Sequence, residues 1–198
     1  MSFKLGITGG IGTGKSAVVA DFKELGAAVL SADDVAREVM AAGSPVLAQL
    51  RKTFGPQVIA PNGGVNRGVL GQLIFADPAK RQQLNQIVQP LIRSKFEDEL
   101  TQLAAQHAFV VCEVPLLFEE HYENLFDAVL VVEAPAGVQQ ERVMSRDGLT
   151  RVAAERRIAS QMPLADKLER ADYAINTDGP EQLRQIQVQQ LMNHLAEN

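Results

Sequence analysis

The chain has 198 residues and a formal net charge of −5, with 46% hydrophobic and 22% charged residues. This composition is typical of one soluble globular domain with a sizeable core, and the negative charge argues against a general binder of nucleic acid or anionic membranes. The single cysteine, Cys112, cannot form an internal disulfide, no apolar run approaches the roughly 18 residues of a membrane span, and no signal peptide precedes the first predicted strand, so we expect a cytoplasmic protein.

A short apolar stretch, residues 4–8, predicts a first strand, and a glycine-rich loop follows it directly. The loop, residues 9–16, has the sequence GGIGTGKS and fits G-x-x-x-x-G-K-[ST], the phosphate-binding motif of nucleoside triphosphatases and kinases. Its glycines let successive backbone N–H groups turn towards an anion. Val18, Phe22 and Leu25 then recur at helical spacing, and the N-terminus of that helix adds partial positive charge. Strand, loop and helix are the context that the motif requires.

Two side chains of this loop carry chemistry. Lys15 is placed to reach the β- and γ-phosphates of a nucleotide, and the Ser16 hydroxyl is placed to hold Mg²⁺. A dinucleotide-binding loop is excluded, because the third glycine of G-x-G-x-x-G, started at Gly10, falls on Lys15. We expect the nucleotide to contact Gly9, Gly10, Ile11, Gly12, Thr13, Gly14, Lys15, Ser16 and Ala17.

Further apolar stretches predict four more strands, at residues 28–30, 109–112, 127–133 and 173–175. Each is a continuous apolar run without polar alternation, which is typical of a parallel sheet covered on both faces. Helical spacing near the end of the chain is shown by Val188, Leu191, Met192 and Leu195. The pattern predicts a doubly wound α/β core, with a parallel five-stranded sheet and flanking helices.

A long segment, residues 31–108, separates the second and third predicted strands and exceeds what a simple crossover needs. We therefore expect an inserted helical subdomain, the place where a nucleotide kinase would hold its second substrate. Residues 61–64, Pro-Asn-Gly-Gly, predict a turn or small hairpin. Pro90 lies within the helical pattern and should kink or restart that helix. One helical stripe is formed by Leu84, Ile87, Val88 and Leu91, and it is continued beyond Pro90 by Ile92, Phe96, Leu100 and Leu103.

Acidic residues follow two of the predicted strands. Glu113 ends the third, where an acid of phosphate-loop enzymes approaches Mg²⁺, so we favour a metal role over an ordinary strand-terminal carboxylate. Asp33 follows the second strand and could accept the proton of an attacking hydroxyl. Alternatively, Ser31, Asp33 or Asp34 caps a helix beginning near Val35, and the sequence leaves both interpretations open.

The segment from Arg142 to Arg170 carries seven basic against four acidic side chains, a net +3 within a chain of −5. Arginines on a mobile lid can close over ATP and neutralise charge on the transferring phosphoryl group. Most of these side chains are expected on a solvated helix face. Arg142 and Arg146 are the expected exceptions, since they lie four residues apart on one helix face.

With these features in place, the chain resembles the dephospho-CoA kinase family over almost its whole length. Residues 115–119, Pro-Leu-Leu-Phe-Glu, are the most distinctive match. The other matching positions are residues 5–16, Ala32, Asp33, Ala36, residues 65–67, Leu70, Phe75, residues 84–87, Gln140, Arg142, Arg146, Gln161, Ala171, Asp172 and Asn176. The phosphate loop alone indicates a superfamily, whereas these further stretches indicate one activity.

The resemblance implies transfer of a phosphoryl group from ATP, with Mg²⁺, to the ribose 3′-hydroxyl of dephospho-CoA, the last step of coenzyme A synthesis. It implies an α/β fold of the phosphate-loop kinase type. This is a single domain with a core of residues 1–42, 106–140 and 171–198, a helical CoA-binding insertion at 43–105 and a helical lid at 141–170. No nucleic acid, membrane or obligate protein partner is expected.

The resemblance also implies roles for individual residues. By this resemblance, Asp33 is the base that orients or deprotonates the 3′-hydroxyl. Arg142 is a lid arginine on the phosphates together with Arg146, and Asn176 lies near the adenine. The residues expected to bind the acceptor are Thr8, Asp33, Arg67, Gln89, Pro115, Leu116, Leu117 and Phe118.

Two positions depart from the family pattern. Ser31 stands where the family usually has aspartate, so a metal or proton role at that position is open. Gln89 stands before Pro90 where the family usually has histidine. Glutamine can orient a substrate but cannot titrate near neutral pH, so we expect an orienting role and retained activity.

Three alternative functions share the phosphate loop. Another phosphate-loop kinase, acting on nucleosides or nucleoside monophosphates, remains the alternative. A GTP-dependent switch is disfavoured, because the chain has no Asn-Lys-x-Asp motif and no aspartate followed three residues later by glycine. A binding scaffold without turnover is disfavoured by the presence of Lys15, Ser16, Asp33 and Glu113.

Overall fold

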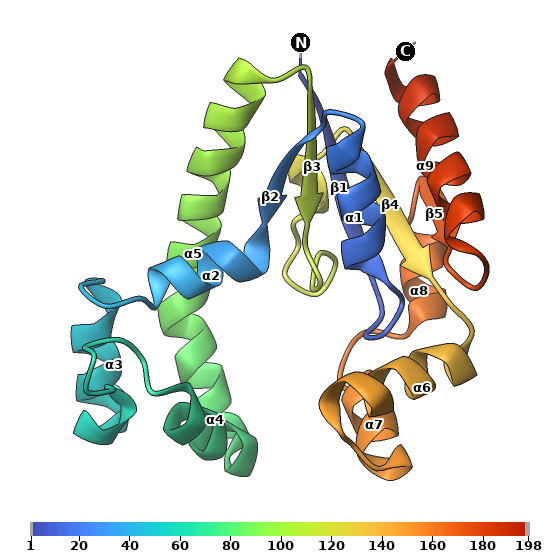
Figure 1. The fold of residues 1–198 in the computed structure, drawn as a ribbon. Helices are drawn as coiled ribbons and strands as arrows, with labels where there is room; N and C mark the ends of the chain where they lie inside the picture. Colours follow the sequence, from blue (N-terminus) through green and yellow to red (C-terminus); the bar gives the residue numbers. More distant parts are fainter. Residues whose placement is uncertain (1, 197–198) are drawn as a thin grey trace. The chain divides into compact units, whose positions relative to one another are not determined.

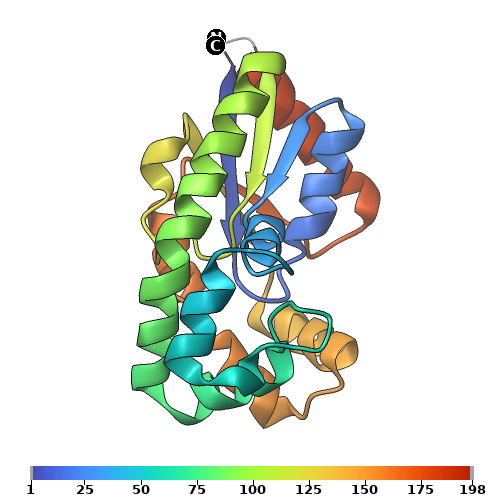
Figure 2. The ribbon, with the colours of Figure 1, turned by 90° about the vertical axis from the view of Figure 1, so that its left-hand side faces the viewer.

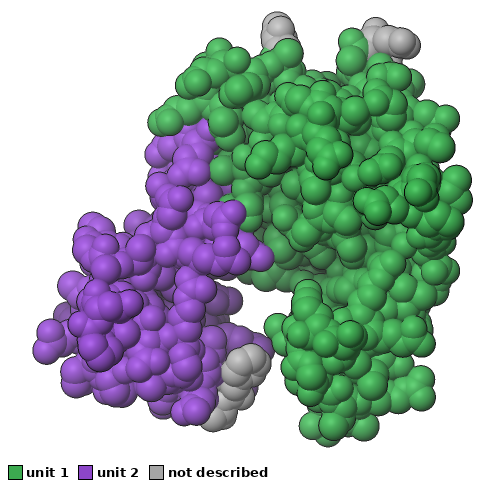
Figure 3. Space-filling model, in the orientation of Figure 1, with its two compact units in different colours: residues 1–31, 100–198 green, residues 32–99 purple. Residues whose placement is uncertain are grey.

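The computed structural model describes residues 2–196, without the side chains of Phe75 and Ala76. The chain forms two compact units, coloured separately in Figure 3. Unit 1 consists of Met1–Ser31 and Leu100–Asn198, and unit 2 consists of Ala32–Glu99. The division into a core, a 43–105 insertion and a 141–170 lid stays a prediction.

Unit 1 is built on a five-stranded sheet in the order β2-β3-β1-β4-β5 (Figure 1). Every neighbouring pair is parallel, which confirms the predicted sheet. The strands are β1 (Phe3–Gly9), β2 (Ala28–Ser31), β3 (Phe109–Glu113), β4 (Ala128–Glu133) and β5 (Tyr173–Asn176). Because parallel strands all point the same way, their carboxyl ends form one edge of the sheet, where ligands of such folds bind.

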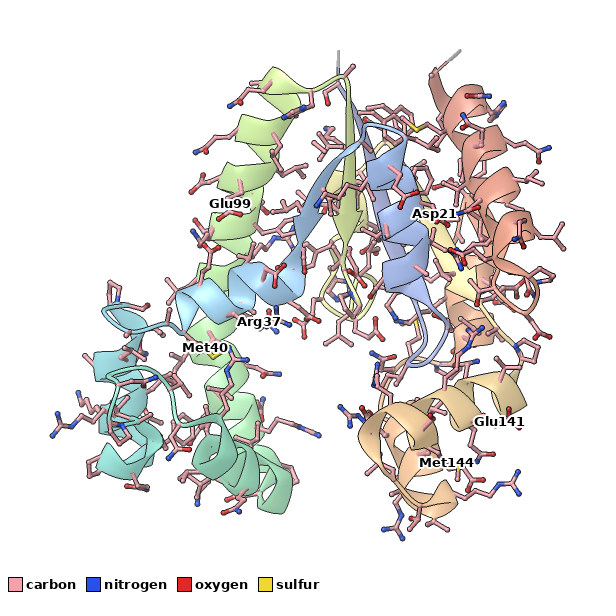
Figure 4. All side chains as sticks on the ribbon, in the orientation of Figure 1. Asp21, Arg37, Met40, Glu99, Glu141 and Met144 are labelled. Carbon is pink, nitrogen blue, oxygen red and sulfur yellow. The ribbon has the colours of Figure 1, made fainter. Side chains whose placement is uncertain are left out.

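Two helices, α1 (Lys15–Glu24) and α9 (Glu181–Ala196), contact each other and pack on the sheet (Figure 1). The core between these layers includes Ile7, Phe22, Leu130, Ile175 and Val188. Asp21 of α1, labelled in Figure 4, also forms a two-bond ion pair with Arg184 of α9, with N–O distances of 2.6 and 3.2 Å. Apolar burial and this ion pair together hold α9 on the sheet.

Three more helices of unit 1 follow β4 and its loop. They are α6 (Ala136–Asp147), α7 (Arg151–Ile158) and α8 (Leu164–Glu169). α6 ends at Gly148 in the left-handed region, and Thr150 caps α7 by accepting from the Ala153 N–H. The predicted boundary between core and lid, at residues 140 and 141, therefore falls inside α6.

Unit 2 is helical. Its elements are α2 (Ala32–Val39), α3 (Val46–Phe54), the 3-10 helix η1 (Pro56–Val58), α4 (Arg67–Ala76) and most of α5 (Pro78–Gln106). Residues 61–64 close a small hairpin, in which Ala60 N–H donates to the Gly64 carbonyl. Lys95 joins two helices by pairing with Glu38 of α2 and with Glu99, labelled in Figure 4, of α5.

Helix α5 passes through Pro90 as one 29-residue helix (Figure 2), so the helix does not restart there. Proline removes one backbone hydrogen bond and costs about 3 kcal/mol inside a helix. Burial offsets this cost, since one face of α5 carries a regular row of buried side chains, namely Leu84, Val88, Ile92, Phe96 and Leu100. Leu91, expected in that row, is 44% exposed instead.

No helix in the described range 2–196 combines the length and the apolar character that crossing a membrane needs.

Candidate active site

The phosphate loop joins the carboxyl end of β1 to α1, and its backbone conformation depends on glycine. Gly12 and Gly14 have φ angles of 80° and 84°. A Cβ atom on Gly12 would lie 2.6 Å from the Gln139 carbonyl oxygen, so α6 packs too closely for any side chain at this position. Gly14 is the residue before α1, which begins without a side-chain cap. The first turn of α1 therefore presents a helix N-terminus of the kind that binds phosphate.

Lys15 is folded over this loop. Its ammonium donates to the Gly10 carbonyl at 2.8 Å and to the Gly9 carbonyl at 3.2 Å. These neutral acceptors hold the ammonium beside the loop, and a phosphate would be a stronger, charged acceptor for it.

The two predicted metal ligands lie together. The Ser16 hydroxyl donates to Glu113 Oε1 at 3.1 Å. The sheet explains this, because Glu113 ends β3 in register with Ile7 of β1, two residues before the loop. A hydroxyl and a carboxylate are hard oxygen ligands of the kind that Mg²⁺ uses together with water and substrate phosphates. Within the described residues, no group of three or more His, Cys, Asp or Glu side chains could hold a metal alone.

Arg142 of α6 lies over the same loop. Its Nη1 donates to the Thr177 hydroxyl at 2.9 Å and its Nη2 donates to the Thr177 carbonyl at 2.8 Å. Nη1 also contacts the Gly12 carbonyl at 3.3 Å. Thr177 directly follows β5, and its hydroxyl lies 2.6 Å from the Thr13 carbonyl. Sequence analysis missed Thr177, for which the only signal is its position just past a strand end.

Arg146 occupies the next turn of α6, the helix marked by Glu141 and Met144 in Figure 4. Its guanidinium makes two hydrogen bonds to Asp147, at 2.8 and 2.9 Å, and this contact raises the pKa of Arg146. An open hollow of about 540 Å³ lies beside it, lined by Gly12, Gly14, Glu141, Arg142, Ser145 and Arg146. Both predicted lid arginines therefore line the same hollow as glycines of the phosphate loop.

Asn176, the predicted adenine neighbour, ends β5 on the other side of Thr177. Its side-chain oxygen accepts from the Asp178 N–H at 2.7 Å, and its amide nitrogen contacts Glu133 at 3.4 Å. The side chain thus shapes the turn that carries Thr177.

The loop of residues 115–119 is held by side chains from distant parts of unit 1. The Pro115 carbonyl accepts from the Thr8 hydroxyl at 3.1 Å and from the Lys167 ammonium at 2.9 Å. Glu119 pairs with Lys167 at 2.9 Å and accepts from the Met162 N–H at 3.0 Å. Lys167, expected with its neighbours on a solvated face, is instead 0% exposed. A fully buried lysine is rare unless it is paired, as here.

The predicted acceptor residues of unit 1 differ in their exposure to solvent. Thr8, Leu117 and Phe118 are buried, and the Arg170 guanidinium lies 4.3 Å from the centre of the Phe118 ring. Leu116 is 37% exposed. Leu116 is thus open to a ligand, whereas Thr8, Leu117 and Phe118 hold the loop in place.

The remaining predicted residues belong to unit 2. Helix α2 begins at Ala32, so Asp33 lies in its first turn rather than before a helix that starts near Val35. Asp33 is exposed, and no hydrogen bond or ion pair of its carboxylate occurs among residues 2–196, whereas the neighbouring Asp34 pairs with Arg37. Negative charge in a first turn favours the helix through its dipole, with or without a second role.

Two further positions of unit 2, Arg67 and Gln89, complete the predicted set, and Ser31 of unit 1 is a departure from the family pattern. Arg67 is exposed at the start of α4, directly after its cap Asn66. Gln89 is half-buried on α5. Ser31 pairs in register with Glu113 in the sheet, and because serine has no carboxylate, Glu113 has no acidic partner at that register position.

Comparisons with known proteins agree on one family. Residues 3–182 match the family model of dephospho-CoA kinase. The chain is 44% identical to the dephospho-CoA kinase of Enterococcus faecalis over 188 residues, covering 95% of this chain and 94% of that protein. It is 45% identical to the dephospho-CoA kinase of Syntrophotalea carbinolica over 193 residues, covering 97% and 92%.

Solved structures give the same result. The dephospho-CoA kinase of Campylobacter jejuni superimposes with a TM-score of 0.77 at 27% identity, covering 100% of this chain and 98% of that chain. TT1252 from Thermus thermophilus gives a TM-score of 0.83 at 33% identity, covering 99% and 97%. Shikimate kinase from Acinetobacter baumannii, at 17% identity and a TM-score of 0.55, shares the fold alone.

Proposed function

The chain belongs to the dephospho-CoA kinase family, and from that premise we propose that it transfers the γ-phosphoryl group of ATP to the ribose 3′-hydroxyl of dephospho-CoA. The products are coenzyme A and ADP, and the step is the last of coenzyme A synthesis. The observation that carries the proposal is the family match over residues 3–182, which includes the phosphate loop and the Pro115–Glu119 loop. We place the reaction in the cytoplasm, with ATP and dephospho-CoA as its only required partners.

On the nucleotide side, we propose that the loop amides, Lys15 and Arg142 bind the triphosphate. Lys15 exchanges its carbonyl acceptors for phosphate oxygens, which are charged and bind an ammonium more strongly. Ser16 and Glu113, whose oxygens lie 3.1 Å apart, are suited to hold Mg²⁺ directly or through water. The chemistry that Mg²⁺ supplies when bound is neutralisation of charge on the β- and γ-phosphates.

For the transfer itself, we propose that Asp33 orients the 3′-hydroxyl and accepts its proton. The hydroxyl oxygen forms a bond to the γ-phosphorus while the bond from that phosphorus to the β–γ bridging oxygen breaks, and ADP leaves. The carboxylate of Asp33 is exposed and has no partner among residues 2–196, so it can accept a proton without first breaking an ion pair.

On the acceptor side, we propose that Arg67, Gln89, Pro115 and Leu116 contact dephospho-CoA. Arg67 is an exposed cation suited to the phosphates of the acceptor. Thr8, Leu117 and Phe118 act indirectly, because their buried side chains hold the loop that carries Pro115 and Leu116.

The deciding experiment is mass spectrometry of dephospho-CoA incubated with ATP, Mg²⁺ and the purified protein. AMP and adenosine serve as control acceptors. We expect conversion of dephospho-CoA to coenzyme A with both controls unchanged, which also establishes that no partner protein is required. Phosphorylation of AMP or adenosine instead would keep the kinase fold and overturn the acceptor. Transfer to no acceptor would contradict the proposed function.

A further inference from the structure

Thr177 is a buried polar residue outside the phosphate-loop motif, and it lies where three segments of unit 1 meet. It directly follows β5 and is 7% exposed. Its backbone is tied to β4, because its N–H donates to the Glu133 carbonyl at 3.0 Å. Its position is therefore set by the sheet and does not depend on its own hydroxyl.

The hydroxyl connects the loop to the arginine. A hydroxyl has a single hydrogen to donate and lone pairs with which to accept. The distances assign the hydrogen to the Thr13 carbonyl, at 2.6 Å, rather than to the Glu133 carbonyl, at 3.4 Å. The oxygen is then free to accept from Arg142 Nη1 at 2.9 Å.

The hydrogen bond from the Thr177 hydroxyl to the Thr13 carbonyl affects the direction of a backbone N–H in the phosphate loop. In a trans peptide the carbonyl and the following N–H point in opposite directions. Holding the Thr13 carbonyl towards Thr177 therefore fixes the direction of the Gly14 N–H away from it. Backbone N–H groups held in this way form the concave anion site of a phosphate loop.

The hydrogen bonds between Thr177 and Arg142 affect the orientation of the guanidinium that lies over the loop. Two donors of its planar guanidinium are engaged by Thr177, one by the hydroxyl and one by the carbonyl. A guanidinium held by two hydrogen bonds keeps one orientation. Arg142 therefore loses less rotamer entropy when an anion binds to it. Arg142 and the loop glycines Gly12 and Gly14 line the same hollow of about 540 Å³.

We propose that the Thr177 hydroxyl is a positioning group for the triphosphate of ATP. It fixes the phosphate-loop backbone at Thr13 and orients the Arg142 guanidinium over that loop. The inference rests on the proposed nucleotide site, but not on the identity of the acceptor.

The test compares Thr177→Val, which keeps the shape and removes the hydroxyl, with Thr177→Ser, which keeps the hydroxyl. The dissociation constant of ATP is measured by calorimetry without acceptor. Losing a buried hydrogen-bonded hydroxyl should raise that constant about tenfold in Thr177→Val, and Thr177→Ser should stay within about twofold of the wild type. The dissociation constant of dephospho-CoA should not change in either variant.

Thr53→Val makes the same chemical change at an exposed position of α3 and should leave ATP binding unaltered. A second comparison places Thr177→Val in an Arg142→Ala background, where its effect should shrink, because contacts that act as a unit are not additive. Full additivity would overturn the link to Arg142.

An ATP dissociation constant within twofold of wild type in folded Thr177→Val would overturn the proposal. Should that variant not fold, Thr177→Ala removes the same hydroxyl, and failure of both to fold would assign Thr177 to stability alone, against the proposal. Wild-type protein that bound no ATP would instead refute the proposed function, so the two failures are distinguishable.

Discussion

Two lysines of unit 1, Lys15 and Lys167, differ in their burial and in how far along the chain their binding partners lie. Lys15 lies in the phosphate loop, is half-buried and binds two neutral carbonyls of its own loop. Lys167 is fully buried and binds Glu119 and the Pro115 carbonyl, which lie 48 and 52 residues away along the chain. The contacts of Lys15 lie within one loop, and we propose that a phosphate replaces them. The contacts of Lys167 join segments far apart in the sequence and take part in holding the fold. Losing the first should cost activity, and losing the second should cost stability.

The largest effect is expected for Lys15→Ala. In the proposed mechanism the ammonium stabilises charge on the transferring phosphoryl group, so kcat/KM should fall about 10³-fold or more. Because Lys15 is half-buried and the hydrogen bonds of its ammonium to Gly9 and Gly10 lie within its own loop, the melting temperature should change little. Steady-state kinetics and thermal melting measure both effects. Lys23→Ala, at an exposed position of α1, is the control and should match wild type. Unaltered turnover in Lys15→Ala would refute the assigned role of the loop.

A second substitution, Asp33→Asn, separates chemistry from nucleotide binding. Removing a general base should lower kcat by about 10² to 10³, while the dissociation constant of ATP should stay within about twofold. Single-turnover kinetics and calorimetry measure the two quantities. The matched control is Asp34→Asn, because Asp34 is the next residue and pairs with Arg37. Equal losses in both variants would indicate that charge at the start of α2, rather than a base, is what matters.

The buried lysine tests the other half of the comparison. Lys167→Met leaves Glu119, a partly exposed carboxylate that keeps its bond to the Met162 N–H, without its charge partner. We expect a loss of about 2–3 kcal/mol in the free energy of unfolding and a fall of about 5–10 °C in melting temperature. Well below that temperature, KM for dephospho-CoA should rise more than KM for ATP, since the 115–119 loop loses a support.

Two variants control this prediction. Lys52→Met, at an exposed position of α3, should melt like wild type. The double variant Lys167→Met, Glu119→Gln should lose less free energy of unfolding than the sum of the losses in the two single variants, because both changes break the same ion pair. If the two losses were strictly additive, the ion pair between Lys167 and Glu119 would contribute nothing to stability beyond its separate side chains.

The same contrast explains what could be predicted from the sequence. The five strands and the phosphate loop were predictable, because apolar runs and a contiguous motif are local signals. Nothing in the sequence around Lys167 distinguishes it from the charged residues beside it, since its burial depends on Pro115 and Glu119 in another segment. Thr177 likewise acts through Thr13, which is 164 residues away. The passage of α5 through Pro90 shows tertiary burial overriding a local rule.

The smallest effect is expected for Gln89→His, which restores the histidine that the family usually has before Pro90. Gln89 is half-buried beside Val88, and its amide can donate and accept hydrogen bonds without titrating. If the position only orients the acceptor, kcat and KM for dephospho-CoA should both stay within about twofold, and the pH dependence of kcat between about pH 5.5 and 8.5 should keep its shape. Gln83→His, at an exposed position of the same helix, controls for the added imidazole. A sharp rise of kcat with unchanged KM, accompanied by a new titration near the pKa of histidine, would assign acid–base work to this position. The acceptor side would then contribute to the chemistry of transfer as well as to substrate position.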